Sequence, residues 1–428
     1  MKITILSQSK ISNEIKKIRK SQEEDFVKVN KIVSNIIKSI RKDGDRALLS
    51  YTKKFDKIEL TLKELKLNKE IIKNSESQLP AALKKAMKLA IKRVKDYQKR
   101  KLTKPYRYKD NYGNQLGWNV TPIERVGIYV PGGTASYPSS LIMTATLAKV
   151  AGVNEIIICT PPSKYGISDS ILYVANLLNI DEIYQVGGAQ GIAAMAYGTK
   201  AIKKVNKIVG PGNIFVAAAK KQVFGDVGID MVAGPSEVLI VSDSKSNPTL
   251  IACDLLAQAE HDSKASAILV TNSRKIANQV LSEVKRLTKN SRRKNIIEKS
   301  IKKNGRIYIM SSIKDCIEFS NNFAPEHLEI FLNKFSDYKD QFKNAGSIFI
   351  GENSAEAFGD YIAGPSHVLP TNGNAMFSSP LSSLDFIKYT SFTSISERGM
   401  RALSNDVEII AESEGLFEHS NSIKARKA

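Results

Sequence analysis

The feature that most constrains the fold is an alternation that begins near residue 126. Short runs of apolar, largely β-branched residues are separated by glycine-rich turns and by stretches with helical periodicity, and they lie at 126–130, 155–160, 182–186, 237–241 and 266–271. Continuous apolar runs of this length are typical of strands that are covered on both faces, as in parallel sheets. The alternation therefore predicts α/β units built on a parallel sheet.

The segments on either side have a different pattern. Residues 1–103 predict helices, because apolar residues recur at helical spacing in 26–40 and 81–102. The stretch 382–401 is polar and mostly helical in pattern. It leads into a tail whose polar side chains suggest recruitment to a site, namely Glu414, Glu418 and His419.

Length and composition place the chain among globular proteins. Its 428 residues are enough for two or three domains, and its apolar content of 42% is ordinary. No apolar run reaches membrane-spanning length, and the N-terminus lacks the apolar region of a signal peptide, so we expect a cytoplasmic protein without membrane contact. Three widely spaced cysteines, Cys159, Cys253 and Cys316, argue against a disulfide framework and a thiolate zinc site.

The formal net charge of +21 invites a nucleic-acid hypothesis. About +18 of this excess falls in residues 1–110, where lysines alternate with Ile and Asn as on a solvated helix face. A basic surface alone supplies only non-specific binding, so we expect no dedicated nucleic-acid role. A nucleic-acid-binding protein that uses this N-terminal third is the non-enzyme alternative.

Histidine is scarce, and each of the four lies in a compact polar or Gly/Pro context. Histidine ligates metals and exchanges protons near neutral pH, so its placement beside carboxylates suggests a site. The contexts are Ala-Glu-His261-Asp, Pro-Glu-His327-Leu-Glu, Gly-Pro-Ser-His367 and Phe-Glu-His419-Ser.

Residues 246–261 predict a helix that carries Gln258 and His261 on one face, because the two are three residues apart. Together with Asp360, which a loop could aim inward, and another histidine, they would form a mixed nitrogen and oxygen site suited to zinc or a similar divalent ion. Taken alone, the pair fits a solvated helix face better, and Asp360 a solvated turn.

Glu326 and His327 begin a predicted strand directly after Pro325. Neighbours on a regular strand point to opposite faces, so a shared site requires an irregular start, which Pro325 favours. A base near neutral pH beside a carboxylate that activates water is what two successive proton removals need. A salt-bridged strand end is the structural alternative.

Glycine-rich turns at 129–133, 186–191 and 209–213 follow predicted strands or precede predicted helices, so their N–H groups could face phosphates. None matches the Gly-x-Gly-x-x-Gly fingerprint of dinucleotide-binding proteins. The pattern indicates an anion or nucleotide site without identifying its ligand.

In order and spacing, these segments resemble the histidinol dehydrogenase family from about Arg125 to the C-terminus. The motifs are Arg-Val-Gly-Ile-Tyr129-Val-Pro-Gly-Gly, Gly-Gly-Ala-Gln190, Val-Gly-Pro-Gly-Asn213, Ala-Gly-Pro-Ser236-Glu, Leu-Ala-Gln258-Ala-Glu-His261, Pro-Glu326-His327-Leu-Glu, Gly-Asp360-Tyr, Gly-Pro-Ser-His367 and Glu414-Gly-Leu-x-x-His419. The Lys-heavy N-terminal region departs from the family pattern, which puts solubility and pI in question and leaves the chemistry untouched.

The resemblance implies an α/β fold of two incomplete Rossmann-like lobes, related to aldehyde dehydrogenases. It also implies a homodimer with shared active sites, in which helical N- and C-terminal segments are swapped. The expected parts are an N-terminal helical arm at 1–24 that contacts the partner, a first α/β lobe at 25–125 plus 237–381, a second, NAD-binding lobe at 126–236, and a C-terminal helical segment at 382–428 that contributes to the partner's active site.

Carried over by residue, the resemblance implies one zinc ion per subunit, held by Gln258, His261, Asp360 and the partner's His419. It implies NAD contacts from Tyr129, Gln190 and Asn213. Contacts to the substrate L-histidinol would come from Ser236, Gln258, His261, His327, Asp360, His367, Glu414 and His419.

For the reaction, the resemblance implies oxidation of L-histidinol to L-histidine, the last step of histidine biosynthesis, through L-histidinaldehyde and with two NAD. His327 would be the recycled base, Glu326 would activate water, and zinc would position the substrate. Aldehyde dehydrogenases usually employ a Cys nucleophile, yet no cysteine lies in a catalytic-looking loop. A zinc hydrolase, in which Glu326 beside His327 activates water for amide cleavage, is the enzyme alternative.

Overall fold

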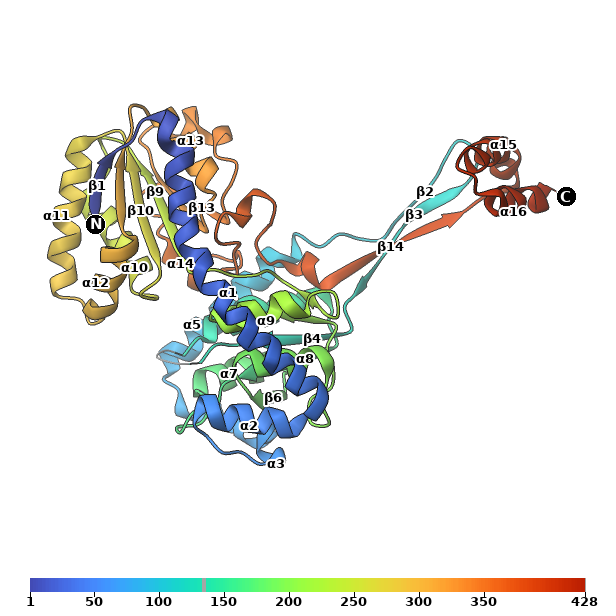
Figure 1. The fold of residues 1–428 in the computed structure, drawn as a ribbon, viewed down its shortest axis with the longest axis horizontal. Coiled ribbons are helices and arrows are strands. Elements are labelled where there is room, and N and C mark those ends of the chain that lie inside the picture. Colours follow the sequence, from blue (N-terminus) through green and yellow to red (C-terminus); the bar gives the residue numbers. More distant parts are fainter. Residues whose placement is uncertain (133–135, 428) are drawn as a thin grey trace.

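The computed structural model describes residues 1–132 and 136–427, and it consists of two α/β lobes and a long projecting arm (Figure 1). Gly133, the last residue of the first glycine-rich motif, lies outside the described residues. The prediction of two Rossmann-like α/β lobes is confirmed.

The first lobe is built on a sheet with the strand order β1-β11-β10-β9-β12-β13. Neighbouring strands run parallel throughout. Strand β1 comes from the N-terminus and pairs with β11, although Lys2 and its partner Arg306 lie far apart in sequence. The strands are β1 (Lys2–Ile5), β9 (Glu237–Ser242), β10 (Ser266–Thr271), β11 (Arg306–Ile309), β12 (His327–Phe331) and β13 (Ser347–Ile350).

The second lobe is built on a parallel sheet with the order β6-β5-β4-β7-β8. Its central strand is buried along its whole length, as the continuous apolar runs predicted. The strands are β4 (Arg125–Tyr129), β5 (Glu155–Thr160), β6 (Glu182–Gln185), β7 (Lys207–Val209) and β8 (Gly228–Ile229).

Helices cover both faces of each sheet. Several begin where the sequence supplies a cap or an N-terminal proline: Asn213 caps α9, Ser312 caps α13, and Pro248 opens α10. The first lobe carries α10 (Pro248–Ala259), α11 (Arg274–Lys289), α12 (Lys294–Asn304), α13 (Ile313–Phe323) and α14 (Glu356–Tyr361). The second carries α2 (Asp45–Asp56), α3 (Leu62–Leu65), α4 (Lys69–Asn74), α5 (Ala81–Lys99), α6 (Pro138–Ala151), α7 (Asp169–Leu177), α8 (Gly188–Tyr197) and α9 (Ile214–Val223).

Helix α1 (Ile11–Asp43) runs across both lobes (Figure 1). Its N-terminal half buries Ile11 and Ile15 in the core beneath the first sheet. Its C-terminal half buries Val33 and Ile37 against the second sheet and helix α8. One continuous helix therefore ties the two lobes together.

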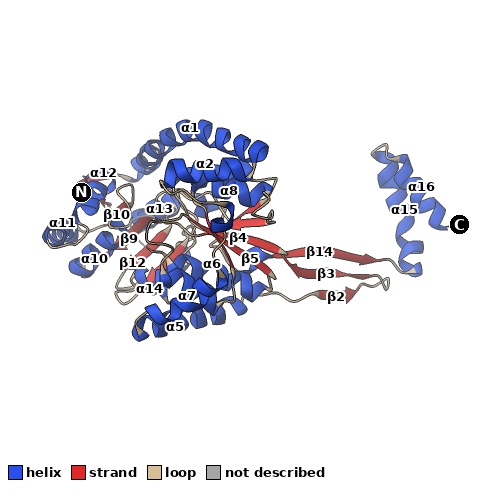
Figure 2. Cartoon of the chain, turned by 90° about the horizontal axis from the view of Figure 1, so that it is seen from below, coloured by secondary structure: helices blue, strands red, loops and turns tan. Residues whose placement is uncertain are grey.

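The arm is a three-stranded antiparallel ribbon with the order β14-β3-β2, and it ends in two helices (Figure 2). The elements are β2 (Tyr106–Lys109), β3 (Gln115–Pro122), β14 (Ile387–Ser394), α15 (Glu397–Ser413) and α16 (Phe417–Lys427). The expectation that 382–401 is mostly helical is wrong, because Ile387–Ser394 pairs along its whole length with β3. Its side chains are largely exposed, so no apolar alternation marked the strand.

The expected grouping of 25–125 with 237–381 differs from the structure, because helices α2 to α5 pack on the second lobe and not on the first. Leu48 and Leu65 lie in the core of the second sheet with Ile157, and Val94 lies on the opposite face of that sheet. The apolar spacing of a helix indicates that it has a buried face, and it does not indicate which sheet covers that face.

The N-terminal segment 1–24 also differs from a purely helical arm, because Lys2–Ile5 forms strand β1 in the first lobe of the same chain. Its contact with a partner stays a prediction. Within the described residues, no helix combines the length and apolar character needed to cross a membrane.

Candidate active site

The imidazole of His327 is buried among three carboxylates that come from two segments of the chain. His327 opens β12, Glu326 precedes it, and helix α14 supplies Glu356 and Asp360. The Nδ1 atom of His327 lies 3.8 Å from Glu326 Oε2 and 3.9 Å from Glu356 Oε2, and its Nε2 atom lies 3.6 Å from Asp360 Oδ1. The structure thus brings together three of the predicted site residues.

The predicted irregular start of this strand is present. Ala324 closes helix α13 in the left-handed conformation, with φ of 48°. The chain then turns through Pro325 into the strand, and Glu326 and His327 face one another instead of pointing to opposite sides of the sheet.

The backbone of Glu237, the first residue of β9, contacts both side chains. Its N–H donates to Glu326 Oε2 at 2.9 Å, and its carbonyl oxygen lies 3.3 Å from His327 Nδ1. Because a carbonyl can only accept, Nδ1 carries the hydrogen in this contact. The Nε2 atom of His327, which faces Asp360, is therefore the nitrogen left to exchange protons.

Burial and mutual charge shift the pKa values of this cluster. Burial raises the pKa of Glu326 to about 7, although the neighbouring His327 opposes the rise. Burial disfavours protonation of His327, but the charge of Glu326, the contact with Asp360 and the charge of Glu356 outweigh it and raise its pKa to about 10. Burial also raises the pKa of Glu356 to about 8. Groups shifted in this way inside a cleft are typical of reactive sites.

Gln258 and His261 lie beside this cluster but do not share a helix face. Helix α10 ends at Ala259, so His261 follows it in a turn. The buried amide of Gln258, oriented to satisfy both neighbours, donates to Glu356 Oε1 at 3.0 Å and accepts from the Glu237 N–H at 3.0 Å.

The sequence suggested that Asp360 lies in a loop, but it lies within helix α14. Its Oδ2 atom is 3.9 Å from His261 Nε2, and the side chain of His261 is 41% exposed. Burial opposes ionisation of Asp360, yet the contact with His327 and its charge lower the pKa of this carboxyl.

A cavity of about 120 Å³ opens between the two lobes next to this cluster. The predicted substrate residues Ser236 and His367 line it together with Glu326. Desolvation lowers the pKa of His367, which favours the neutral imidazole. From the second lobe, the glycine-rich loop Gly210–Gly212 also lines this cavity.

The predicted NAD residues lie in the second lobe around this loop. Asn213 caps helix α9, and its Oδ1 accepts from the N–H groups of Phe215 and Val216. Tyr129 and Gln190 are buried, and the Tyr129 hydroxyl accepts from the Gly188 N–H at 3.0 Å. Of the three glycine-rich turns, Gly210–Gly212 lines the cavity, whereas the described residues of the other two do not.

A buried ion pair holds the loop Gly210–Gly212 in place. Lys220 of α9 contacts Asp230 and donates to the carbonyl of Gly210 at 3.0 Å. Asp230 in turn accepts from the Gly210 N–H at 2.8 Å. Both the N–H and the carbonyl of Gly210 are therefore fixed by charged side chains.

Glu414 and His419 do not join the cluster within one chain. Both are exposed at the far end of the arm, around helices α15 and α16 (Figures 1 and 2). Among the residues that the structure describes, no group of three or more His, Cys, Asp or Glu side chains is arranged to hold a metal ion.

The sequence did not point to Glu356, which lies against His327 and Gln258. It is four residues before Asp360, so a predicted helix over this segment would have placed both on one face. Beneath it, Glu329 accepts from the Glu356 N–H at 2.7 Å, and burial and the charge of Asp254 raise the pKa of Glu329.

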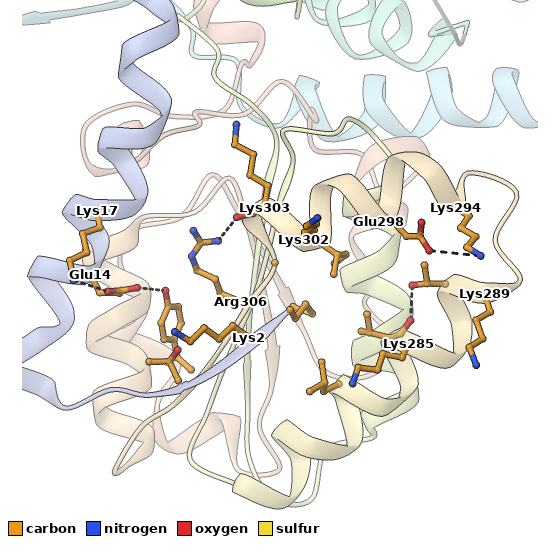
Figure 3. Close-up of a pocket in the computed structure, with 18 residues that line it drawn as sticks. Lys2, Glu14, Lys17, Lys285, Lys289, Lys294, Glu298, Lys302, Lys303 and Arg306 are labelled. Carbon is orange, nitrogen blue, oxygen red and sulfur yellow. Dashed lines mark hydrogen bonds and ion pairs between the residues drawn. The ribbon is translucent and has the colours of Figure 1, made fainter.

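A larger, basic pocket of about 1110 Å³ lies elsewhere, on the side of the first lobe formed by β1, α11 and α12 (Figure 3). Lysines dominate its lining, and its acids are engaged: Glu14 accepts from Tyr308, and Glu298 pairs with Lys294. The described residues that line it do not include the predicted site residues.

The geometry around His327 suits proton removal and water activation. A buried imidazole whose orientation is fixed by a backbone carbonyl lies beside a carboxylate with a pKa near neutrality. The adjoining His261 and Asp360 offer a nitrogen and an oxygen donor to a cation.

Comparison with known proteins agrees with this geometry. The histidinol dehydrogenase family model matches residues 19–427. A histidinol dehydrogenase from Clostridium acetobutylicum is 49% identical over 410 residues, which is 96% of this chain and 95% of the relative. One from Listeria monocytogenes is 43% identical over 426 residues, which is 100% of this chain and 99% of the relative. The crystal structure of histidinol dehydrogenase from Elizabethkingia anophelis superposes with a TM-score of 0.89 at 38% identity, over 92% of this chain and 91% of that one. The chain belongs to the histidinol dehydrogenase family.

Proposed function

We propose that the protein oxidises L-histidinol to L-histidine, the last step of histidine biosynthesis, with NAD as the oxidant. The observation that carries this proposal is the burial of His327 against Glu326 and Asp360 at a cavity between the lobes. The family membership supplies the substrate.

The conversion of a primary alcohol to a carboxylate comprises two oxidations with a hydration between them. His327 Nε2 takes the hydroxyl proton as the alcohol carbon loses a hydride, which yields L-histidinaldehyde and the first H⁺. Glu326 then takes a proton from water, whose oxygen adds to the aldehyde carbon. The protonated His327 returns its proton to the former carbonyl oxygen, so that a diol forms and the imidazole is again a free base. His327 serves again when the diol loses its proton and hydride. NAD, when bound, accepts one hydride in each oxidation.

We assign one zinc ion per subunit to Gln258, His261, Asp360 and His419 of the partner subunit. The 3.9 Å between His261 Nε2 and Asp360 Oδ2 supports this assignment, because zinc bonds of about 2.0–2.2 Å would let one ion touch both. When bound, zinc would position the nitrogens of the substrate and act as a Lewis acid. A cation on Asp360 would also weaken the attraction that holds the proton on His327.

Contacts to NAD would come from Tyr129, Gln190 and Asn213, through the turns that these side chains support. The loop Gly210–Gly212 fits this role, because it lines the cavity and its N–H groups precede helix α9. Contacts to the substrate would come from Ser236, Gln258, His261, His327, Asp360, His367, Glu414 and His419.

A homodimer with shared sites would explain the arm. Glu414 and His419 are exposed at its end, and Ile409, Ile410 and Phe417 leave more than half of their surface uncovered there. We propose that this end inserts into the site of a second copy, and that residues 1–24 also contact the partner. A cytoplasmic location stays a prediction.

The direct test is the appearance of NADH absorbance on mixing the protein with L-histidinol and NAD, before and after treatment with a chelator. We expect two NADH per histidinol, loss of turnover in the chelator and recovery with added Zn²⁺. Metal-loaded, folded protein that forms no NADH would refute the proposed function, and amide cleavage by that protein would favour a zinc hydrolase.

The shared site has its own test. His419→Ala and Asp360→Ala variants should each lose zinc and activity, and mixed dimers of the two should recover part of both, because one site of each mixed dimer has every ligand. Verified mixed dimers that stay zinc-free and inactive would place His419 in its own chain's site.

A further inference from the structure

Arg19 is a largely buried cation of helix α1 that reaches the candidate active site. Its Nη1 atom contacts the carboxylate of Glu237 and lies 3.2 Å from Asn372 Oδ1, and its Nη2 atom donates to the carbonyl of Phe323 at 2.6 Å. The guanidinium also lies 4.2 Å from the centre of the Phe323 ring. The side chains of Arg19 and Glu237 are only 15% and 0% exposed.

The three contacts of Arg19 lie on three separate segments that adjoin site residues. Glu237 opens strand β9 directly after Ser236, and Phe323 is the last residue of helix α13, which leads into Glu326 and His327. Asn372 lies five residues after His367. These three residues are 218, 304 and 353 positions away from Arg19 in the chain. A planar guanidinium with donors on several edges can hold three such partners at once, whereas an ammonium group cannot reproduce that geometry.

Glu237 transmits this contact to the reacting groups. Its side chain is held by Arg19, and its own N–H and carbonyl contact Glu326 and His327. A shift of the Glu237 backbone would therefore move the acceptor that fixes the imidazole and the donor that fixes the carboxylate.

Docking of the helix does not require this ion pair. Ile11, Ile15 and Ile18 already bury the N-terminal half of α1 in the apolar core. Taking two charges out of water carries a desolvation penalty that buried pairs often do not recover as stability. A role in the geometry of the site accounts for the placement of Arg19 better than a role in anchoring the helix.

We propose that Arg19 is a positioning residue for the Glu326 and His327 pair and acts through Glu237. The inference rests on the proposed function, in which these two residues move the protons. It gives helix α1 a part in the chemistry, although the helix supplies no group that touches the substrate.

The test compares the full-length, zinc-loaded enzyme with Arg19→Ala, Arg19→Lys and a matched control, Arg41→Ala. Arg41 lies on the same helix and stacks over Tyr197 at 4.7 Å, in the second lobe. We expect Arg19→Ala to lower kcat about 10- to 100-fold, since small misplacements of reacting groups have effects of this size, and to leave the KM for NAD within about 3-fold. Ethylguanidinium should restore part of kcat, and ethylammonium should not.

A second readout does not depend on turnover. With four histidines in the chain, the ring signal of His327 can be assigned by NMR, and it should shift in Arg19→Ala and not in Arg41→Ala. Arg19→Lys keeps the charge and most of the volume of the side chain, so it replaces Arg19→Ala in the test if the alanine variant does not fold. Arg19→Lys should also lower kcat.

Three outcomes would overturn the proposal: an equal loss of kcat in Arg19→Ala and Arg41→Ala, an unshifted His327 signal in Arg19→Ala, or wild-type kcat in Arg19→Lys. A wild-type enzyme that makes no NADH from histidinol would instead refute the proposed function, so the two failures are distinguishable.

Discussion

Replacing Lys220 by Met should destabilise the second lobe strongly. The ammonium group is nearly fully buried, and its loss leaves the Asp230 charge uncompensated and the Gly210 carbonyl without its donor. Breaking a buried pair from one side costs about 3–5 kcal/mol. Lys220→Met should therefore lower the free energy of unfolding by about this amount, and it should raise the KM for NAD because the loop at Gly210 loses its support.

Urea unfolding followed by circular dichroism at 222 nm measures the first effect, and initial rates at varied NAD measure the second. Lys221→Met is the matched control, because the neighbouring lysine is exposed and its loss should stay within about 0.5 kcal/mol. The double variant Lys220→Met with Asp230→Asn should recover about 2 kcal/mol, since the amide oxygen can still accept from the Gly210 N–H without a buried charge. A Lys220→Met protein as stable as the Lys221→Met protein would show that the reasoning is wrong.

Three further predictions concern single sites. Burial raises the pKa of Asp56 to about 6, so ionisation of this carboxyl in the folded state lowers the free energy of unfolding as pH rises from about 4 to 6. After allowance for solvent screening, Asp56→Asn should therefore raise the free energy of unfolding by about 1 kcal/mol at pH 7.5 and leave it unchanged at pH 4. Equal shifts of the urea midpoint at both pH values would contradict this. Cys159→Ser and Cys253→Ser should keep most activity, because neither cysteine lines the cavity; a folded but inactive variant would exclude the hydration route. Gly210→Ala should raise the KM for NAD at least about 10-fold, because Gly210 has φ of +116° and an added Cβ would lie 2.1 Å from a backbone carbonyl oxygen. The control is Gly225→Ala, which should leave the KM for NAD unchanged, because Gly225 has a similar φ of +107° but open space around it.

Local patterns predicted the elements whose two faces are both buried. The runs near 126, 155, 237 and 266 became strands with ends within about two residues of the expected ones, because continuous apolar character reports burial directly. Strand β14 has largely exposed side chains and depends on a partner more than 250 residues away. Nothing in its own sequence could show that partner.

The candidate site was predictable where chemistry is local in sequence. Glu326 and His327 are adjacent, so their pairing could be proposed. Asp360 was expected in a loop because it stands just before the Gly-Pro-Ser-His367 turn, and Gly359 weakens the helix pattern there. That glycine is required by packing, since an added Cβ would meet the Phe349 ring at 2.6 Å. Arg19 could not be selected at all, because it is one of many basic residues in the N-terminal third and its three partners are all distant.

The position of β1 at the edge of the first sheet has a consequence for biosynthesis. A ribosome that makes about 5–20 residues per second completes Arg306 about 15–60 s after Lys2. During this interval β4 to β8 emerge in full, and the C-terminal half of α1 can dock on α8 and α9. The apolar residues Ile11, Ile15 and Ile18 can be buried only after the strands of the first lobe have been made. The nascent chain therefore exposes the apolar face of the N-terminal half of α1 beside an already folded second lobe. Exposed apolar surfaces of this kind are what chaperones bind.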